Sequence, residues 1–245
     1  MISSRRYFLT ASVGAVGAAV AAVTGPAVLA TTLPGSAPAK GGKTTLTPDQ
    51  ALELLKEGNR KFLTDSPVRA AVGRQRRLEI AKGQAPFAAY VTCSDSRVSP
   101  ELLFGRGLGE LFIIRNAGNT VDTVALGSIE YAVAELGVPL IVVMGHERCG
   151  AVAAAASVVR DNATFPGAIG RMVEPIIPAV LKAQGQPGDL VENSIRENVR
   201  RVANQLRTAT DQLLMAPQRT GRLKVVGAYY DLDTGTVDFF DQPRA

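Results

Sequence analysis

The feature that most constrains the fold is a series of continuous apolar runs separated by segments of helical periodicity. The runs occupy residues 86–93, 111–114 and 139–144. The segment 120–136 between the last two has its large apolar residues at helical spacing: Leu126, Ile129, Val133 and Leu136. A strand that is apolar along its whole length needs cover on both faces, which parallel sheets receive from their crossover helices. The sequence therefore predicts an α/β fold with a mainly parallel central sheet flanked by helices.

A helical arm is predicted ahead of these runs. Thr47 precedes Pro48 and stands three residues before Gln50, an arrangement typical of a helix start. The arm that follows is amphipathic, with Leu52 and Leu55 on one stripe. Such a stripe needs cover, so we expect it to pack on the domain core or on a partner subunit.

The carboxyl-terminal part predicts further helices and a hairpin. Helices are expected after Gly150 and at 191–207, where apolar residues recur at helical spacing. An apolar run at 223–230, a short turn and a second run at 236–240 predict a C-terminal strand hairpin. The segment 161–189 contains four prolines, and its pattern predicts no element.

The amino end has the character of an export signal. Arg5 and Arg6 precede a weakly apolar stretch of Ala, Gly and Val at 11–30. This order resembles a twin-arginine signal, and small residues allow cleavage after Ala30 or Ala39. A retained membrane anchor and an unstructured arm are the alternatives. We expect export by the twin-arginine machinery across the bacterial cytoplasmic membrane, to the periplasm, the cell envelope or the medium, with the signal removed.

This interpretation divides the chain into a signal over residues 1–30, a linker over 31–46 and one globular domain over 47–245. The formal charge is +5 at pH 7, and two of those charges belong to the signal. The 245 residues include five Tyr, eight Phe and no Trp, and the basic residues are scattered. A surface that stacks bases or follows phosphates is therefore not expected, and we predict no nucleic-acid partner.

Two cysteines and one histidine stand near the ends of predicted strands. Cys93 closes the first run, and His146 and Cys149 follow the third at a turn that starts a helix. Ligands of open parallel sheets bind outside the carboxyl ends of the strands, so we expect the three side chains at one edge. Two thiolates and an imidazole suit zinc, and three protein ligands leave one tetrahedral position open, as in catalytic sites. The chain has no other Cys or His; the alternative is a disulfide beside an ordinary buried histidine.

Asp95 and Arg97 follow Cys93 in a loop, where they can form a charge-assisted pair that keeps the carboxylate ionised. A pair that only braces the loop is the alternative. The segments Cys93-Ser94-Asp95-Ser96-Arg97 and His146-Glu147-Arg148-Cys149-Gly150 resemble the two signatures of beta-class carbonic anhydrases. The resemblance extends over 83–84, 109–119, 129–132 and 227–231, and so covers most of residues 47–240.

The resemblance implies an enzyme, a carbonate dehydratase among the zinc lyases. It implies reversible hydration of carbon dioxide to bicarbonate and a proton by zinc-bound hydroxide, with one zinc per subunit on Cys93, His146 and Cys149. Asp95, held by Arg97, is implied either to orient the hydroxide or to bind zinc as an alternate fourth ligand in an inactive state. A homodimer or a higher homo-oligomer is also implied.

Substrate contacts follow from the same resemblance. Gln84 is implied to donate a hydrogen bond to a substrate oxygen, and an apolar wall for carbon dioxide is implied for Phe112, Ala117 and Tyr131. The backbone N–H of Gly150, at a helix start, is suited to an oxygen of bicarbonate.

Two other functions fit the same residues. A carbon disulfide or carbonyl sulfide hydrolase would use the same scaffold and ligands. A non-catalytic zinc-binding or redox-sensing protein would use the two cysteines but would give Asp95, Arg97 and Gln84 no task. Within the resembled family, some members sense bicarbonate through a tryptophan three residues before the first cysteine. Tyr90 stands there in this chain, which favours the branch with water on zinc.

Overall fold

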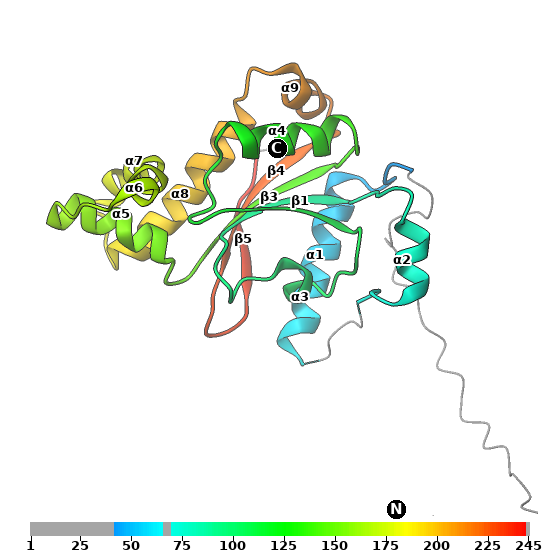
Figure 1. The fold of residues 1–245 in the computed structure, drawn as a ribbon, viewed down its shortest axis with the longest axis horizontal. Helices are drawn as coiled ribbons and strands as arrows, with labels where there is room; N and C mark the ends of the chain where they lie inside the picture. The colour runs from blue at the N-terminus through cyan, green and yellow to red at the C-terminus, as the bar shows by residue number, and fades with distance from the viewer. Residues whose placement is uncertain (1–41, 66–69, 244–245) are drawn as a thin grey trace, which may run out of the picture. The chain divides into compact units, whose positions relative to one another are not determined.

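A computed structural model describes residues 42–65 and 70–243, and the predicted signal and most of the linker lie outside the described residues. The core is a five-stranded sheet in the order β2-β1-β3-β4-β5 (Figure 1). The strands are β1 (Ala88–Thr92), β2 (Leu111–Arg115), β3 (Leu140–His146), β4 (Lys224–Tyr230) and β5 (Val237–Asp241). Strands β1 to β4 pair in parallel, and β5 pairs with β4 in antiparallel fashion. The predicted fold class and C-terminal hairpin are confirmed.

Helices cover both faces of this sheet. They are α1 (Pro48–Leu63), α2 (Arg74–Ile80), α3 (Pro100–Leu103), α4 (Thr123–Ala134), α5 (Gly150–Asp161), α6 (Gly167–Val173), the 3₁₀ turn η1 (Glu174–Ile176), α7 (Ile177–Ala183), α8 (Leu190–Arg207) and α9 (Gln212–Arg219). No helix in the described ranges has the length and apolar character that crossing a membrane requires.

Alternate residues of the strands supply two separate cores. Tyr90, Val142 and Val226 pack with α1 and α3 on one face. Their neighbours along the strands, such as Ile141 and Val225, pack with α4, α8 and α9 on the other face (Figure 1). Both faces of the strands are therefore buried, which explains the continuous apolar runs in the sequence.

The N-terminal arm begins as predicted. The Thr47 side chain accepts a hydrogen bond from the backbone N–H of Gln50, and the Gln50 side chain accepts one from the backbone N–H of Thr47 at 2.9 Å. Leu52 and Leu55 are buried in the chain's own core. The apolar stripe of the arm was expected to pack either on the domain core or on a partner subunit, and these two residues pack on the domain core.

The segment 161–189, for which the sequence pattern predicted no element, is largely helical. It forms α6, η1 and α7, and prolines stand in the first turns of η1 and α7, where a missing N–H costs no hydrogen bond. Helix α9 was not predicted either. Strand β3 is longer than its apolar run, because Gly145 and His146 continue the pairing with Tyr229 and Tyr230 of β4.

Helix α8 lies close to the sheet because two strand positions are glycine. A Cβ atom added at Gly145 of β3 would come 2.8 Å from Val199 Cγ2 and 2.9 Å from Ile195 Cγ2. One added at Gly227 of β4 would come 2.8 Å from Val199 Cγ1. These glycines let the helix approach the strand ends that carry His146.

We predict that Gly145→Ala lowers the free energy of unfolding by about 1–3 kcal/mol, because the added methyl group overpacks the contact with α8. Gly127→Ala in α4 is the matched control, since a Cβ there meets nothing within 4 Å. Urea unfolding at equal protein concentration measures both variants. Equal stability of the two would show that α8 does not need the glycine.

Candidate metal centre

Three side chains meet at the carboxyl edge of the sheet. Cys93 directly follows β1, His146 is the last residue of β3, and Cys149 is the N-cap of α5. All three are buried, and one ligand atom from each lies within 4.8 Å of the other two. The parallel pairing of β1 with β3 therefore produces the predicted convergence of residues that are more than fifty positions apart in the chain.

The donor set fits zinc. His146 Nδ1 lies 2.9 Å from the backbone carbonyl oxygen of Glu147, which leaves Nε2 as the coordinating nitrogen. Nε2 is buried and has no hydrogen-bond partner among the described residues. The two sulfurs are 4.0 Å apart and both thiols are free, so the disulfide alternative does not hold. Two sulfurs and one imidazole nitrogen around one point are ligands that zinc prefers, with a fourth position left for water or substrate.

The two thiols differ in acidity. A hydrogen bond from the Cys149 thiol, together with contacts to His146 and the Gly118 N–H, lowers the pKa of Cys93. The shared hydrogen bond and burial raise the pKa of Cys149. One thiolate is thus already favoured by the fold, and a metal that binds thiolates must displace the proton that Cys149 retains.

Asp95 lies beside the cluster and is held by Arg97. Arg97 donates from Nε to Asp95 Oδ1 at 2.9 Å and from Nη2 to Oδ2 at 2.8 Å, and its backbone N–H donates to Oδ1. This bidentate pair lowers the pKa of Asp95 well below its usual range. Oδ2 is 3.9 Å from His146 Nε2. The carboxylate is therefore ionised and close to the point where the three ligands converge.

The turn between the two ligands of the second motif is braced from other elements. Arg148, which lies between His146 and Cys149, has a φ of +52°, a value unusual for a residue with a side chain. Its backbone N–H donates to Glu192 of α8 at 3.4 Å. Glu147 accepts a hydrogen bond from the backbone N–H of Leu232 at 3.0 Å. The hairpin loop and α8 therefore both hold this turn.

Sequence reasoning gave no role to three further residues around Cys93. Arg115 donates to the backbone carbonyls of Cys93 at 3.0 Å and of Asp95 at 2.6 Å, and so fixes the loop that carries both. The N–H of Gly118 donates to Cys93 Sγ at 3.4 Å, and Asn198 of α8 donates to the carbonyl of Gly118 at 2.8 Å. Arg115 and Gly118 belong to a segment that carries the family resemblance, but Asn198 gives no signal in a single sequence.

The remaining predicted residues separate into two groups. Ala117 is next to Gly118, and Gly150 is the first residue of α5, so both lie at the metal edge. Gln84 is exposed and lies before the start of β1, at the opposite end of that strand from the metal edge. A strand rises about 3.3 Å per residue, so the five residues of β1 alone put about 13 Å or more between Gln84 and that edge. Phe112 pairs with Ala89 near the start of β1, and its ring lies 6.3 Å from that of the half-exposed Tyr131. Within a single chain, Gln84, Phe112 and Tyr131 therefore do not lie at the metal centre.

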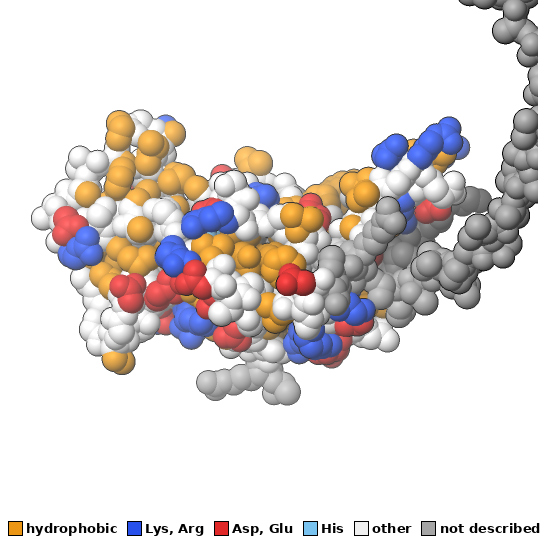
Figure 2. Space-filling model, turned by 90° about the horizontal axis from the view of Figure 1, so that it is seen from below, with side chains coloured by type: hydrophobic (Ala, Val, Ile, Leu, Met, Phe, Trp, Pro, Cys, Tyr) orange, Lys and Arg blue, Asp and Glu red, His pale blue; other side chains and the backbone are white. Residues whose placement is uncertain are grey.

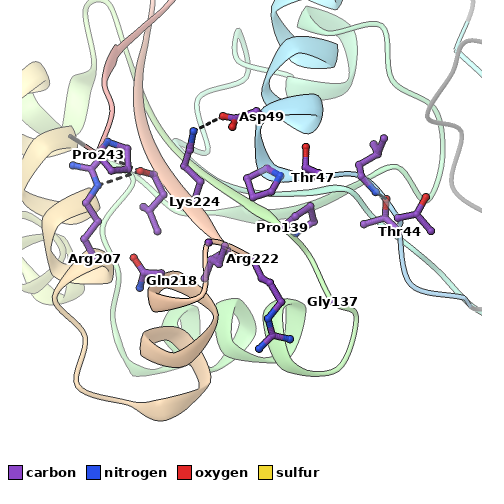
Figure 3. A pocket seen from close by; sticks show the side chains of 16 residues that line it. Thr44, Thr47, Asp49, Gly137, Pro139, Arg207, Gln218, Arg222, Lys224 and Pro243 are labelled. Atoms are coloured by element: carbon purple, nitrogen blue, oxygen red, sulfur yellow. Dashed lines mark hydrogen bonds and ion pairs between the residues drawn. The ribbon is translucent and has the colours of Figure 1, made fainter. Parts of the chain in front are cut away.

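A cavity of about 790 Å³ lies at the opposite, amino-terminal edge of the sheet (Figure 3). It is lined by Thr44, Pro139 and Lys224 among others, and by none of the predicted site residues. Among its charged groups, Lys224 pairs with Asp49 and Arg207 with Asp241, and Arg222 donates a hydrogen bond to the Thr220 hydroxyl at 3.1 Å. This cavity has no unpaired ligand set comparable to that of the metal centre.

Comparisons with known proteins agree with this geometry. A family model for carbonic anhydrase matches residues 88–237. Carbonic anhydrase 2 of Mycobacterium tuberculosis is 40% identical over 189 residues, which is 77% of this chain and 90% of that protein. The solved structure of Coccomyxa beta-carbonic anhydrase in complex with acetazolamide has a TM-score of 0.61 at 29% identity and covers 77% of this chain and 86% of that one.

A structure from a study of two tetrameric beta-carbonic anhydrases of Sordaria macrospora has a TM-score of 0.59 at 29% identity, over 67% of this chain and 85% of that one. The fold, the Cys-His-Cys cluster and these relatives all lead to one conclusion. The chain belongs to the beta-class carbonic anhydrases, the zinc enzymes that reversibly hydrate carbon dioxide to bicarbonate and a proton.

Proposed function

We propose that one zinc ion per subunit is held by Cys93, His146 and Cys149, and that Asp95 and Arg97 complete the catalytic centre. The observation that carries the proposal is the convergence, beside an ionised carboxylate, of two buried sulfurs and an imidazole nitrogen that has no hydrogen-bond partner within the described part of the chain. When bound, zinc would lower the pKa of a water molecule so that it forms the hydroxide that attacks carbon dioxide, and two thiolate ligands would make this water less acidic than one held on three neutral imidazoles.

Asp95 orients the nucleophile in this proposal. Both of its oxygens are engaged by Arg97, yet Oδ2 faces the metal centre and can accept a further hydrogen bond. A carboxylate held this way accepts a hydrogen bond from the nucleophile's remaining O–H and so directs a lone pair of the nucleophile's oxygen toward the substrate carbon. The same pair with Arg97 keeps Asp95 from moving onto the metal, where it would occupy the position that the nucleophile needs.

The substrate side is formed by the loop around Ala117 and by the start of α5. The N–H of Gly150, in the first turn of that helix, has no intrahelical partner and contributes to the partial positive charge of the helix N-terminus. It can donate to an oxygen of bicarbonate. Ala117 gives the site a small apolar surface, which suits an uncharged linear substrate.

Asp95→Asn should reduce the turnover of carbon dioxide hydration by about 100-fold or more, because a neutral amide accepts the nucleophile's hydrogen bond more weakly than a carboxylate and can present its NH2 donor instead. Zinc content should stay near one per subunit, since Asp95 is not among the three ligands. Stopped-flow hydration and metal analysis measure the two quantities. Asp238→Asn, an exposed aspartate paired with Arg196, is the control and should change neither. Full activity in the Asp95 variant with zinc bound would contradict the role proposed for Asp95.

Carbon disulfide serves as a parallel substrate in the same assay. A hydrolase of carbon disulfide or carbonyl sulfide would use the same ligands, so the ratio of the two activities separates the functions. We expect carbon dioxide to be the preferred substrate. A non-catalytic zinc-binding or redox-sensing role would give the ion pair between Asp95 and Arg97 no task.

We further propose that the working enzyme is a homodimer or a higher homo-oligomer whose second copy completes the site. Gln84, Phe112 and Tyr131 lie away from the metal centre of their own chain, and Tyr131 is 50% exposed. Exposed apolar side chains also include Ile169 of α6 and Leu181 of α7. Figure 2 shows hydrophobic side chains gathered at the left end of the molecule, where α5, α6 and α7 lie in Figure 1. The Sordaria macrospora relatives are described as tetrameric, which supports assembly here.

Subunit mixing tests this arrangement. Cys93→Ser subunits should lack metal chemistry, and Gln84→Ala subunits should be impaired in substrate binding. If a site combines the metal of one subunit with Gln84 of another, mixed dimers regain one intact site of two, so the mixture should be more active than either parent. Activity of the mixture that is merely the average of the two parents would contradict sharing.

The export assignment is the last part of the proposal. Arg5 and Arg6 are its basis, and a route for folded cargo suits an enzyme that binds its metal before export. Replacing both with lysine should keep the uncleaved protein in the cytoplasm, as judged by cell fractionation and the mass of the purified chain. Lysine replacements of Arg200 and Arg201, another adjacent pair, are the control. Normal export of the first variant would contradict the assignment.

A further inference from the structure

The N–H of Gly118 reaches a metal ligand because of the turn in which it lies. The backbone N–H of Asn119 donates to the carbonyl of Asn116 at 3.3 Å, which closes a four-residue turn. Gly118 is the third residue of this turn and has a φ of +78°, the value that a type II turn requires at that position. A Cβ atom there would be strained at this φ and would come 2.5 Å from Ile176 Cδ1, so the position favours glycine. Its N–H points at Cys93 Sγ, 3.4 Å away.

The N–H and the carbonyl of Gly118 belong to the two different peptides on either side of its Cα atom. The turn sets the first peptide, which joins Ala117 to Gly118 and carries the N–H. Glycine has the widest conformational freedom of any residue, so the second peptide, which joins Gly118 to Asn119, needs a restraint of its own if the Cα atom is to stay in place.

Asn198 supplies the missing restraint. Its side chain comes from α8, 80 positions along the chain, is 1% exposed, and donates from Nδ2 to the carbonyl of Gly118 at 2.8 Å. Its Oδ1 atom is buried without a hydrogen-bond partner among the described residues. An unsatisfied buried oxygen is costly, so the amide is not explained by packing, for which an apolar residue would serve better.

We infer that Asn198 is a positioning residue of the metal centre: by holding the peptide that follows Gly118, it fixes the Gly118 Cα atom in place and so keeps the Gly118 N–H within reach of Cys93 Sγ. The inference rests on the proposed role of Cys93 as a zinc ligand. A hydrogen bond to a ligating sulfur withdraws charge from it and leaves the metal more electrophilic, and partners of this kind tune metal sites. Asn198 thus acts on the reaction from outside the site, through the backbone of Gly118.

Cobalt substitution tests this inference by spectroscopy. In Asn198→Leu, which keeps approximate volume but has no donor, the thiolate-to-cobalt charge-transfer band should move to longer wavelength, because a sulfur that has lost its N–H donor gives up an electron more easily. Hydration turnover should fall by about 10-fold or more, because the metal becomes less electrophilic. Asn198→Ser, which is polar but too short to reach the Gly118 carbonyl, should shift the band in the same direction and keeps the test available if the leucine variant does not fold.

Asn59→Leu is the matched control. Asn59 is also a buried asparagine that holds a loop, with Nδ2 donating to the carbonyl of Gly235 at 3.0 Å and Oδ1 accepting from the N–H of Val237 at 2.9 Å. Its loss should lower stability without moving the charge-transfer band. The comparison therefore separates general destabilisation from an effect on the thiolate.

The outcomes distinguish the inference from the ligand assignment. A charge-transfer band in the wild-type cobalt protein that shifts in both Asn198 variants and stays in place in the Asn59 variant supports the role of Asn198. A wild-type band that does not shift in either Asn198 variant overturns it. A wild-type cobalt protein with no thiolate band at all would instead overturn the assignment of Cys93 and Cys149 as ligands.

Discussion

The parallel pairing of β1 with β3 is the constraint on which the rest of the structure depends. Thr92 and Met144 are partners in this register, and the Thr92 hydroxyl also donates to the Met144 carbonyl at 3.1 Å. Cys93 and His146 follow at the same edge as a consequence. A shift of one residue would turn the side chains of a strand to the other face, so the buried cores on both faces also fix the ligand geometry.

Helix α8 connects this edge to the rest of the domain. It approaches closely because Gly145 and Gly227 have no side chains, and it holds both ligand-bearing loops through Glu192 and Asn198. The metal ligands thus lie on loops whose backbone is tied to regular elements. A catalytic metal needs ligands that are already in position, since each loose loop would have to be ordered when the metal binds.

The sequence predicted the features that depend on local pattern or on residue chemistry. Continuous apolar runs predicted the buried parallel sheet, and Thr47 with Gln50 predicted the start of α1. The donor types of Cys93, His146 and Cys149 predicted a zinc site, because the strand-end rule places them together. The ion pair between Asp95 and Arg97 was predictable from two residues in one loop.

The rest depends on tertiary contacts that a single sequence does not display. Helices α6 and α7 are short and rich in proline, so their periodicity is too brief to detect. Asn198 looks like any polar residue of an amphipathic helix, and only the fold shows that it is buried against Gly118. The positions of Gln84 and Tyr131 far from the metal edge likewise follow from the topology, although resemblance had assigned them to the same site.

The most direct test of the account is a crystal structure of the zinc-loaded protein near pH 8. The account predicts zinc bound to Cys93, His146 and Cys149, a water molecule in the fourth position, and Asp95 still paired with Arg97. Zinc elsewhere, or a fourth position filled by the Asp95 carboxylate with the pair to Arg97 broken, would contradict it.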